Sequence, residues 1–558
     1  MSHFERLALL LLRAPALPAR DRQPRPVEPD EPRYAEVARE MRLTGDYFVP
    51  HLNGRIYSEK PPLLFWTIAL ASLPEGSVSE VSARVPSLLA GIAILFLLFG
   101  IAARLFDRRV AWWSVLIFGT AGRILWQARV GQIDMLLMAL VTLAMYGFVR
   151  GWTERRPGFY RLFFVAAGFA TLAKGPVGLL PPLLGVLLFV RVSGERRRWR
   201  ELGLASGLLI WAAITLVWLV PAAISGGGAY LETLLLKQNV ERFANPWHHF
   251  NPPWYYLTTI PADLFPWSFF LPGALWVGWR RSSGPERTGY LFALCWAAVT
   301  VLFFSLSPAK RTVYVLQMFP ALAMLVAQLF AEVEQSCRSW GRSDLGSPPS
   351  RLRHWLTVPC FLLVSIFALL PLALPRAAER RPELALLGYD LLWIVGGIAL
   401  LLAVCAAGAW VSATRGRARG VVTGLAVGMA LAATIASWFV FPRIDVLKSL
   451  RPMSERLLAE SAPDHPYAIF PRLDPPFVFY TRRFAETPAN EAELQAFARG
   501  PGQRWLLIEK GALAALTSPL PMTEVERSPG GDESYVLLGG TGEEPQSAGS
   551  SSGLAQVF

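Results

Sequence analysis

Long apolar stretches dominate the chain from about residue 85 to residue 441, and short breaks rich in arginine separate them. A bilayer with a hydrocarbon core of about 30 Å needs roughly 20 apolar residues per helix. The pattern therefore predicts about twelve membrane-spanning helices. Their approximate limits are 85–103, 110–128, 131–149, 160–173, 176–193, 202–224, 262–279, 288–306, 312–331, 355–375, 388–411 and 420–441. We expect an all-α polytopic membrane protein.

The composition supports this interpretation, because 53% of the 558 residues are hydrophobic and only 17% are charged. The net charge of +13 would suggest a nucleic-acid partner, but the arginines are concentrated in alternate breaks between the predicted spans, which lie on one side of the membrane. Cation-rich breaks alternate with breaks that carry few cations, and the positive-inside rule places the former in the cytoplasm. The segments 30–83, 225–261 and 305–312 and the tail after residue 442 then face outward. Membrane lipid is the expected partner, and no nucleic acid is.

The same alternation requires a thirteenth helix that crosses outward before residue 30. The sequence there, LALLLLRAPALPAR, is too short and carries Arg13 in its middle. A central arginine costs about 2.5 to 3.5 kcal/mol on insertion scales, against a few tenths gained per leucine. We therefore interpret residues 1–29 as a defective or truncated first transmembrane segment.

The first outward loop, residues 30–83, is dense in charge, and its pattern predicts two helices at the membrane interface. An apolar stripe at helical spacing lies opposite a charged face, which is typical of an amphipathic helix in the interface plane. The stripe consists of Tyr34, Val37, Ala38 and Met41, and the charged face of Arg33, Glu36, Arg39 and Glu40. The apolar stretch from Leu63 to Leu73 is too short to span the bilayer and predicts the second interfacial helix.

Charged residues near the membrane boundary are candidates for chemistry. Asp30 occupies an N-cap position, so it is either a cap or a functional acid, and the local sequence leaves both open. Lys60, which follows Glu59, either binds a lipid phosphate at headgroup depth or snorkels to anchor a helix end. Asp134 begins the span 131–149, downstream of Arg129. An acid at that depth is a functional candidate by default, although the helix dipole lowers its cost.

Two further outward segments carry cations. The loop KQNVERFANPWHHFNPPWYYL brings Arg242, His248 and His249 beside an aromatic belt. The turn SLSPAKRTVYVL places Lys310 and Arg311 outward, against the positive-inside trend, so a local anion is expected there. Tyr314 follows about one helical turn after Lys310 and could share its face.

No disulfide framework and no confident metal site are predicted. The cysteines lie inside spans or in a cytoplasmic break and none lies in an outward loop; they are Cys295, Cys337, Cys360 and Cys405. The two histidines of the 225–261 loop are more often a packing feature than metal ligands. A divalent metal near Glu59 and His249 is the alternative, and no cofactor is otherwise required.

The tail from 442 to 540 alternates short apolar stretches with helix-like patterns. The stretches PYAIFPRL, FVFYTRR, RWLLIEKG and SYVLLGG interleave with SERLLAESA and EAELQAFARG. This predicts a small outward α/β domain, connected to a transmembrane bundle over 84–441. The Gly/Ser-rich end, 541–558, is expected to be disordered.

Several of these motifs resemble the bacterial lipid A aminoarabinose transferases and the wider protein O-mannosyltransferase-like family with the class C glycosyltransferase (GT-C) fold. They are DEPRYAEVAREM, GDYFVPHLNG, YSEKPPLLFW, Asp134 at a helix start and SPAKRTVYVLQMFPAL. The resemblance covers residues 30 to about 321, with a similar topology to 441. It implies a bundle of about thirteen helices, a C-terminal periplasmic domain and an undecaprenyl-phosphate-linked sugar donor.

By position, the resemblance also implies roles for individual residues. Asp30 and Asp134 match the acidic pair of the family, and Glu59 with Lys60 matches its EK motif. The implied contacts to the donor phosphate and headgroup are Arg33, Tyr34, Arg242, Lys310 and Tyr314, with Arg129, His248 and His249 as further candidates. The intact first span of the family is the feature that this sequence lacks.

The implied activity is transfer of a pentose or hexose from polyprenyl (undecaprenyl) phosphate to a lipid A, glycan or protein acceptor, on the periplasmic face of the bacterial inner membrane. The leaving phosphate is a stable anion, so cations such as Lys60, Arg242 and Lys310 are needed and a general acid is not. A hydroxyl acceptor would need Asp30 or Asp134 as a base, whereas a phosphate acceptor would need only positioning. Two alternatives stay open: a flippase for lipid-linked sugars, and a homologue made inactive by its first span.

Overall fold

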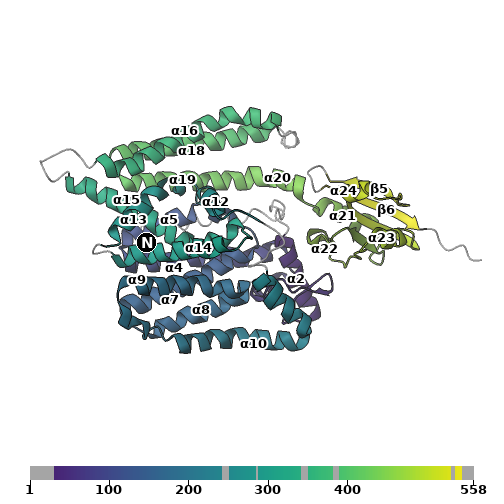
Figure 1. The fold of residues 1–558 in the computed structure, drawn as a ribbon. Coiled ribbons are helices and arrows are strands. Elements are labelled where there is room, and N and C mark those ends of the chain that lie inside the picture. Colours follow the sequence, from purple (N-terminus) through teal and green to yellow (C-terminus); the bar gives the residue numbers. More distant parts are fainter. Residues whose placement is uncertain are drawn as a thin grey trace, which may run out of the picture.

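The computed structural model describes residues 30–241, 250–283, 287–340, 350–380, 389–528 and 534–542. The predicted defective span at 1–29 and residues 543–558 of the predicted tail lie outside these ranges. Figure 1 shows a bundle of long helices with a small domain of sheet and short helices at one end, next to α2. A predominantly helical membrane bundle with a C-terminal α/β domain is therefore confirmed.

Helices follow all twelve predicted spans. Their bounds are α4 (Glu80–Leu105), α5 (Arg108–Gly119), α6 (Gly122–Gln127), α7 (Ile133–Glu154), α8 (Gly158–Lys174), α9 (Leu180–Ser193), α10 (Leu204–Leu231), α12 (Tyr255–Asp263), α13 (Leu271–Arg281), α14 (Arg287–Leu306), α15 (Phe319–Trp340), α16 (Ser350–Arg380), α18 (Tyr389–Thr414) and α19 (Ala418–Ile435). Two π-helical segments, η5 (Glu232–Glu241) and η8 (Ala436–Val440), extend α10 and α19, and the 3₁₀ turn η7 (Thr312–Met318) leads into α15.

Within the described ranges, eight helices are long and apolar enough to cross a membrane. The count is nine if α8, together with η3 (Gly175–Gly178), and α9 are taken as one bent span. These two helices meet at an angle of 86°. The sequence pattern predicts more spans because it ignores interruptions. The stretch 110–128 is divided between α5 and α6, and the stretch 262–279 is interrupted by η6 (Trp267–Phe270). The chain is a multi-pass membrane protein.

Burial distinguishes the centre of the bundle from its edge. In the span Thr312–Cys337, 94% of an apolar 18-residue stretch is buried, whereas in Leu204–Asn239 only 17% of such a stretch is buried. A helix that is apolar all round and poorly covered by protein faces lipid. The segment that carries η7 is therefore held at the centre, which fixes the turn that precedes it.

The segment 30–83 folds into α2 (Asp30–Thr44), a hairpin of β1 (His51–Leu52) and β2 (Arg55–Ile56), and α3 (Leu63–Ala71). The predicted apolar stripe of α2 is buried against α3 and the bundle. The opposite face differs from the prediction of a helix with an exposed charged side, because Glu36 and Glu40 are 0% and 1% exposed. The C-terminal domain covers this face through α22 (Pro475–Thr481).

That domain begins after α20 (Phe441–Lys448) and contains one four-stranded sheet in the order β3–β4–β6–β5. Strand β3 (Tyr467–Phe470) is parallel to β4 (Gly502–Glu509), while β6 (Tyr535–Gly542) is antiparallel to both β4 and β5 (Thr523–Arg527). Its helices are α21 (Arg451–Glu460), α22, α23 (Glu491–Ala498) and α24 (Lys510–Ala514).

One apolar stretch of the domain, FVFYTRR, is helix α22 and not part of the sheet. Asp474 caps the helix by accepting a hydrogen bond from the backbone N–H of Phe477 at 3.0 Å, and Pro475 occupies the first helical position. Both are helix-start signals that outweigh the aromatic and β-branched composition of the stretch.

Candidate active site

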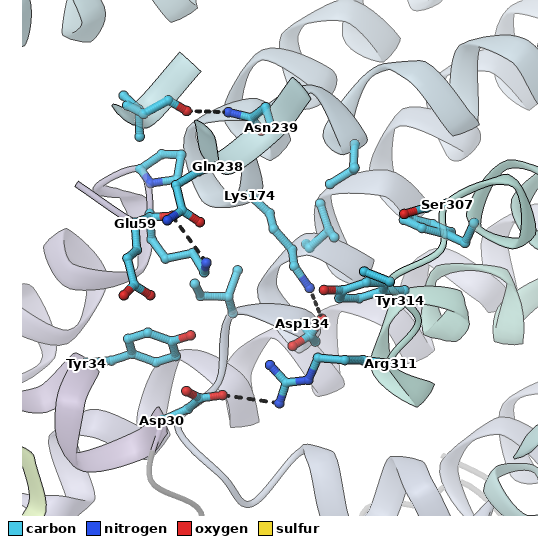
Figure 2. Close-up of a pocket in the computed structure, with 18 residues that line it drawn as sticks. Asp30, Tyr34, Glu59, Asp134, Lys174, Gln238, Asn239, Ser307, Arg311 and Tyr314 are labelled. Atoms are coloured by element: carbon cyan, nitrogen blue, oxygen red, sulfur yellow. Dashed lines mark hydrogen bonds and ion pairs between the residues drawn. The ribbon is translucent and has the colours of Figure 1, made fainter. Parts of the chain in front are cut away.

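A cavity lies where the segment 30–83 meets the bundle (Figure 2). Its water-accessible volume is about 120 Å³. Its polar walls come from α2, the segment before α3, the start of α7, the end of α8, η5 and the turn before η7. The polar lining residues are Asp30, Tyr34, Glu59, Lys60, Asp134, Lys174, Gln238, Asn239, Ser307, Arg311 and Tyr314. The sequence motifs that lie far apart along the chain therefore converge on one small volume.

Asp30 lies in the first turn of α2 and pairs with two arginines. Its Oδ2 is 3.4 Å from Nη2 of Arg311, and its Oδ1 is 3.4 Å from Nη1 of Arg33. Nη1 of Arg33 is also 3.9 Å from Oε2 of Glu59. Arg33 does not line the cavity itself, but it ties the carboxylates of Asp30 and Glu59 together from beside it.

Asp134 lies in the first turn of α7, where its Oδ1 accepts a hydrogen bond from Nζ of Lys174 at 2.5 Å. The same Nζ is 4.9 Å from the ring centroid of Tyr314. Lys174 ends α8, and Gly175 follows with a φ of 76°, which glycine adopts without strain. A Cβ at Gly175 would lie 2.6 Å from Oδ1 of Asn239. Glycine thus lets α8 end against η5 and directs Lys174 into the cavity.

Both residues of the EK motif line the cavity, and Glu59 lies across it from Tyr314 (Figure 2). Nζ of Lys60 donates to the backbone carbonyl of Glu59 at 3.2 Å, and the Glu59 carboxylate accepts from the hydroxyl of Tyr57 at 3.3 Å. Tyr34 is buried beside them. Burial and the nearby carboxylate of Asp30 raise the pKa of Tyr34 well above its ordinary value, so its hydroxyl stays protonated and can donate.

Lys310 is not among the residues that line this cavity, so its predicted contact with the donor stays a prediction. Its side chain is buried, and Nζ donates to the carbonyl oxygens of Ser307 at 2.6 Å and Asn251 at 3.0 Å. Burial also lowers the pKa of Lys310. The next residue, Arg311, lines the cavity instead. Consecutive side chains in a turn point in different directions, so the sequence pair alone could not decide between them.

Arg129 is also directed elsewhere. Its guanidinium contacts the hydroxyl of Ser437 and lies 5.2 Å from the ring centroid of Phe441. Both partners belong to the segment that leads from α19 to the C-terminal domain. Arg129 therefore joins the bundle to that segment and is not part of the cavity wall.

The remaining predicted residues, Arg242, His248 and His249, lie outside the described residues. No group of three or more His, Cys, Asp or Glu side chains in the described part of the chain could hold a metal ion. The metal predicted near Glu59 and His249 therefore stays a prediction.

Sequence reasoning missed several polar residues of the cavity. Lys174 carried a usable signal, because it is a cation on the predicted outward side between the spans 160–173 and 176–193, just as Lys310 is between its spans. Gln238 and Asn239 carried none, because a π-helical turn that extends a lipid-facing helix has no distinctive sequence pattern.

Comparison with known proteins gives two kinds of likeness. The profile of the dolichyl-phosphate-mannose-protein mannosyltransferase family matches residues 59–221. Among curated proteins, the undecaprenyl phosphate-alpha-4-amino-4-deoxy-L-arabinose arabinosyl transferase of Edwardsiella ictaluri is 33% identical over 308 residues, which are 54% of this chain and 54% of that protein. The chain spans about half the length of the curated relatives it matches.

Solved structures extend the likeness over nearly the whole chain. The crystal structure of ArnT from Cupriavidus metallidurans bound to undecaprenyl phosphate has a TM-score of 0.78 at 22% identity, covering 96% of this chain and 97% of that one. The oligosaccharyltransferase of Archaeoglobus fulgidus has a TM-score of 0.51 at 12% identity, covering 91% and 69%. The bundle therefore has the class C glycosyltransferase fold.

Proposed function

We propose that the chain is an aminoarabinose transferase-like member of the class C glycosyltransferases and that it transfers a sugar from a polyprenyl-phosphate carrier to an acceptor. One observation carries the proposal. Three carboxylates and three cations line a single small cavity at one end of a membrane bundle. The carboxylates are Asp30, Glu59 and Asp134, and the cations are Lys60, Lys174 and Arg311. With Arg33 beside them, the cluster has one cation more than it has carboxylates, which suits the single negative charge of the donor phosphodiester and the further charge that develops as it leaves as a monoester.

In the proposed reaction the acceptor oxygen bonds to C1 of the sugar while the bond between C1 and the phosphate oxygen breaks. The electron pair of that bond goes to the phosphate, and C1 is inverted. Lys60, Lys174 and Arg311 would neutralise the charge that develops on the departing phosphate, and such preorganised electrostatic stabilisation is usually the largest catalytic effect. No general acid is needed because the phosphate leaves as a stable anion.

The acceptor determines whether a base is used. An acceptor hydroxyl must lose its proton, and Asp30 and Asp134, which both line the cavity, are carboxylates that could take it. A phosphate acceptor, as on lipid A, is already an anion and would need only positioning beside C1. The relatives are named as arabinosyl transferases that use undecaprenyl phosphate-linked aminoarabinose. We propose the same class of donor, a pentose or hexose on undecaprenyl phosphate, with lipid A, another glycan or a protein as the acceptor.

The proposed location is the bacterial inner membrane, with the cavity facing the periplasm. Helix α4 supports this orientation, because Glu80 at its start lies near the cavity end and Arg104 lies at its other end. A rise of 1.5 Å per residue puts about 36 Å between them, which is enough to cross the hydrocarbon core. Arg104 pairs there with Glu154, which also binds Arg150. The arginine-rich end is the side that the positive-inside rule assigns to the cytoplasm.

The deciding experiment uses the purified full chain in lipid nanodiscs with a radiolabelled undecaprenyl-phosphate sugar. We expect release of the carrier phosphate, and loss of that release in Asp30→Asn and Lys60→Met. Lys237→Met is the matched control, because Lys237 pairs with Glu232 at 3.9 Å and its side chain is 49% exposed. Movement of the lipid-linked sugar across vesicles without bond cleavage would instead support the flippase, and neither activity would support an inactive homologue.

Two further measurements address the acceptor and the metal. Mass spectrometry of lipid A and surface glycans in a deletion strain would identify the modified acceptor by the sugar that it lacks. Comparison of carrier release with and without EDTA would test the metal predicted near Glu59 and His249. Activity that falls with EDTA and returns with a divalent cation would support that site.

A further inference from the structure

We propose that the C-terminal domain holds the two acids of the cavity, Asp30 and Asp134, in their relative positions, and that Tyr480 and Asn53 are the positioning residues through which it acts. The domain lies at the end of the bundle beside α2 (Figure 1). None of the residues that the structure describes in this domain lines the cavity. Its effect on the site must therefore pass through the elements that it contacts.

The first attachment is the turn of the β1–β2 hairpin. Nδ2 of Asn53 donates to the carbonyl oxygen of Ala485 at 2.8 Å, and the N–H of Ala485 donates to Oδ1 of Asn53 at 2.8 Å. On the other side of the same turn, the N–H groups of Asn53 and Gly54 donate to the carboxylate of Glu40 at 2.5 and 3.0 Å. Because Glu40 belongs to α2, this turn links the domain to the helix that carries Asp30.

The second attachment is the start of α4. The hydroxyl of Tyr480, on α22, donates to Oε1 of Glu80 at 2.7 Å. Nη1 of Arg451, on α21, lies 3.7 Å from the same oxygen. Glu80 is the first residue of a membrane-spanning helix, so the domain is fastened to the bundle itself as well as to the loop.

Arg84, one turn further along α4, connects this attachment to both acids. Its Nε and Nη2 donate to the two oxygens of Glu31 at 2.6 and 3.2 Å, and Oε1 of Glu31 also accepts from the N–H of Gly131 at 3.1 Å. Glu31 directly follows Asp30. Gly131 precedes Asp134 by three residues, and a Cβ at this glycine would lie only 2.7 Å from the carbonyl oxygen of Ala83 on α4.

These contacts form one continuous frame. Glu31 is 1% exposed, and its two-point bond with an arginine fixes direction as well as distance. The frame joins α2, α4 and the segment before α7, and the C-terminal domain closes it at Glu80 and Glu40. A misplacement of reacting groups by about 1 Å can cost on the order of 100-fold in rate. Weakening the contacts of the C-terminal domain with Glu80 or with the β1–β2 turn should therefore slow the reaction, although no group is removed from the cavity.

The test is Tyr480→Phe, which removes the hydroxyl and keeps the ring. Tyr467→Phe is the matched control, because the hydroxyl of Tyr467 bonds to Thr481 at 2.9 Å and to the carbonyl of Arg483 at 2.7 Å, inside the domain. Since the rate readout rests on the proposed function, we measure carrier release by the full chain. We expect kcat to fall roughly tenfold in Tyr480→Phe, with KM for the donor and the melting temperature matching those of the control. A kcat equal to that of Tyr467→Phe would overturn the inference.

A second readout does not depend on activity. We expect hydrogen exchange of the backbone amides of residues 31–44 to be faster in Tyr480→Phe and in Asn53→Gly than in Tyr467→Phe. Glycine is the suitable replacement for Asn53, whose φ is 55°. If the wild-type chain releases no carrier phosphate, the proposed function fails while this exchange measurement still decides the positioning role. Equal exchange in all three variants would refute it.

Discussion

Nζ of Lys174 lies 2.5 Å from Oδ1 of Asp134, so the end of α8 and the start of α7 meet in one ion pair although the two residues are 40 positions apart. The two side chains are 16% and 11% exposed. Removal of one partner from a buried pair leaves an uncompensated charge and typically costs about 3 to 5 kcal/mol. Loss of either partner alone should therefore destabilise the bundle as well as disturb the proposed chemistry.

Replacing both members of this pair should harm stability less than replacing one. Lys174→Met leaves the carboxylate of Asp134 without its ammonium partner, so we expect a clear drop in melting temperature. Lys174→Met combined with Asp134→Leu removes both charges, and the melting temperature should recover in part, while carrier release stays lost. Thermal unfolding in detergent measures this. A double variant whose loss equals the sum of the two single losses would show that the two residues are not coupled.

Mutation of Arg311 should mainly reduce activity, whereas mutation of Lys310 should mainly reduce stability. Arg311→Met removes a cation from the cavity wall, and we expect kcat to fall by about 100-fold or more, the usual effect of losing one group that stabilises developing charge. Its melting temperature should change little, because the side chain is 36% exposed. Lys310→Met should show the reverse, since it deprives two carbonyl oxygens of their donor. Measurement of kcat and of the melting temperature for both variants tests these roles. A loss of stability in Arg311→Met together with a loss of kcat in Lys310→Met would contradict them.

The contact between α2 and the C-terminal domain should weaken as the pH rises. Burial, reinforced by the carboxylate of Glu36, raises the pKa of Glu40 from 4.5 to about 7, although two backbone N–H groups and Arg39 act against the shift. A carboxyl group whose pKa is higher in the folded state stabilises that state below about pH 4.5, and this contribution is lost as the pH rises through 7. We expect slower exchange of the α2 amides at pH 5 than at pH 8, after correction for intrinsic rates. In Glu40→Gln the corrected exchange rate of these amides should no longer depend on pH. If it changes with pH as in the wild type, another group is responsible.

Gly175→Ala should test how closely α8 approaches η5. Alanine would have to adopt a φ of 76° and place its Cβ 2.6 Å from Oδ1 of Asn239. The backbone strain alone should cost about 1 to 3 kcal/mol. Gly194→Ala is the matched control, with a φ of 84° and nothing within 4 Å of the added Cβ. We expect Gly175→Ala to lower both the melting temperature and carrier release further than Gly194→Ala, and equal effects would exclude a steric role for Asn239.

Features encoded within single elements could be predicted from the sequence. The apolar stretches predicted where the helices lie. The polar residues before the span 131–149 indicated that Asp134 lies near a helix start, and the apolar stripe from Tyr34 to Met41 predicted which side of α2 is buried. Each of these patterns repeats along one helix, so neighbouring residues suffice to recognise it. Interruptions inside apolar runs, such as η6, remain hidden because they barely change local hydropathy.

Features set by contacts between distant elements could not be predicted. Glu36 and Glu40 read as an exposed face because the domain that covers them begins about 400 residues later in the chain. Which of Arg311 and Lys310 lines the cavity depends on how one turn packs against Ser307 and Asn251. The outward position of Lys174 could be predicted, but its pairing with Asp134, 40 residues earlier in the chain, could not. In each case the deciding partner is far away in sequence or the deciding geometry is a side-chain direction, and hydropathy reports neither.

The bond between Asn53 and Ala485 also constrains how the protein is made. The two residues are 432 positions apart, so at typical translation speeds of about 5 to 20 residues per second the ribosome needs roughly 20 to 90 s to deliver the second after the first. During that interval the helices of the bundle insert while α2 has only its apolar side covered. Under the proposed positioning role, a nascent chain that stalls before residue 485 would therefore carry every described lining residue of the cavity in the membrane without the contacts that hold them in position.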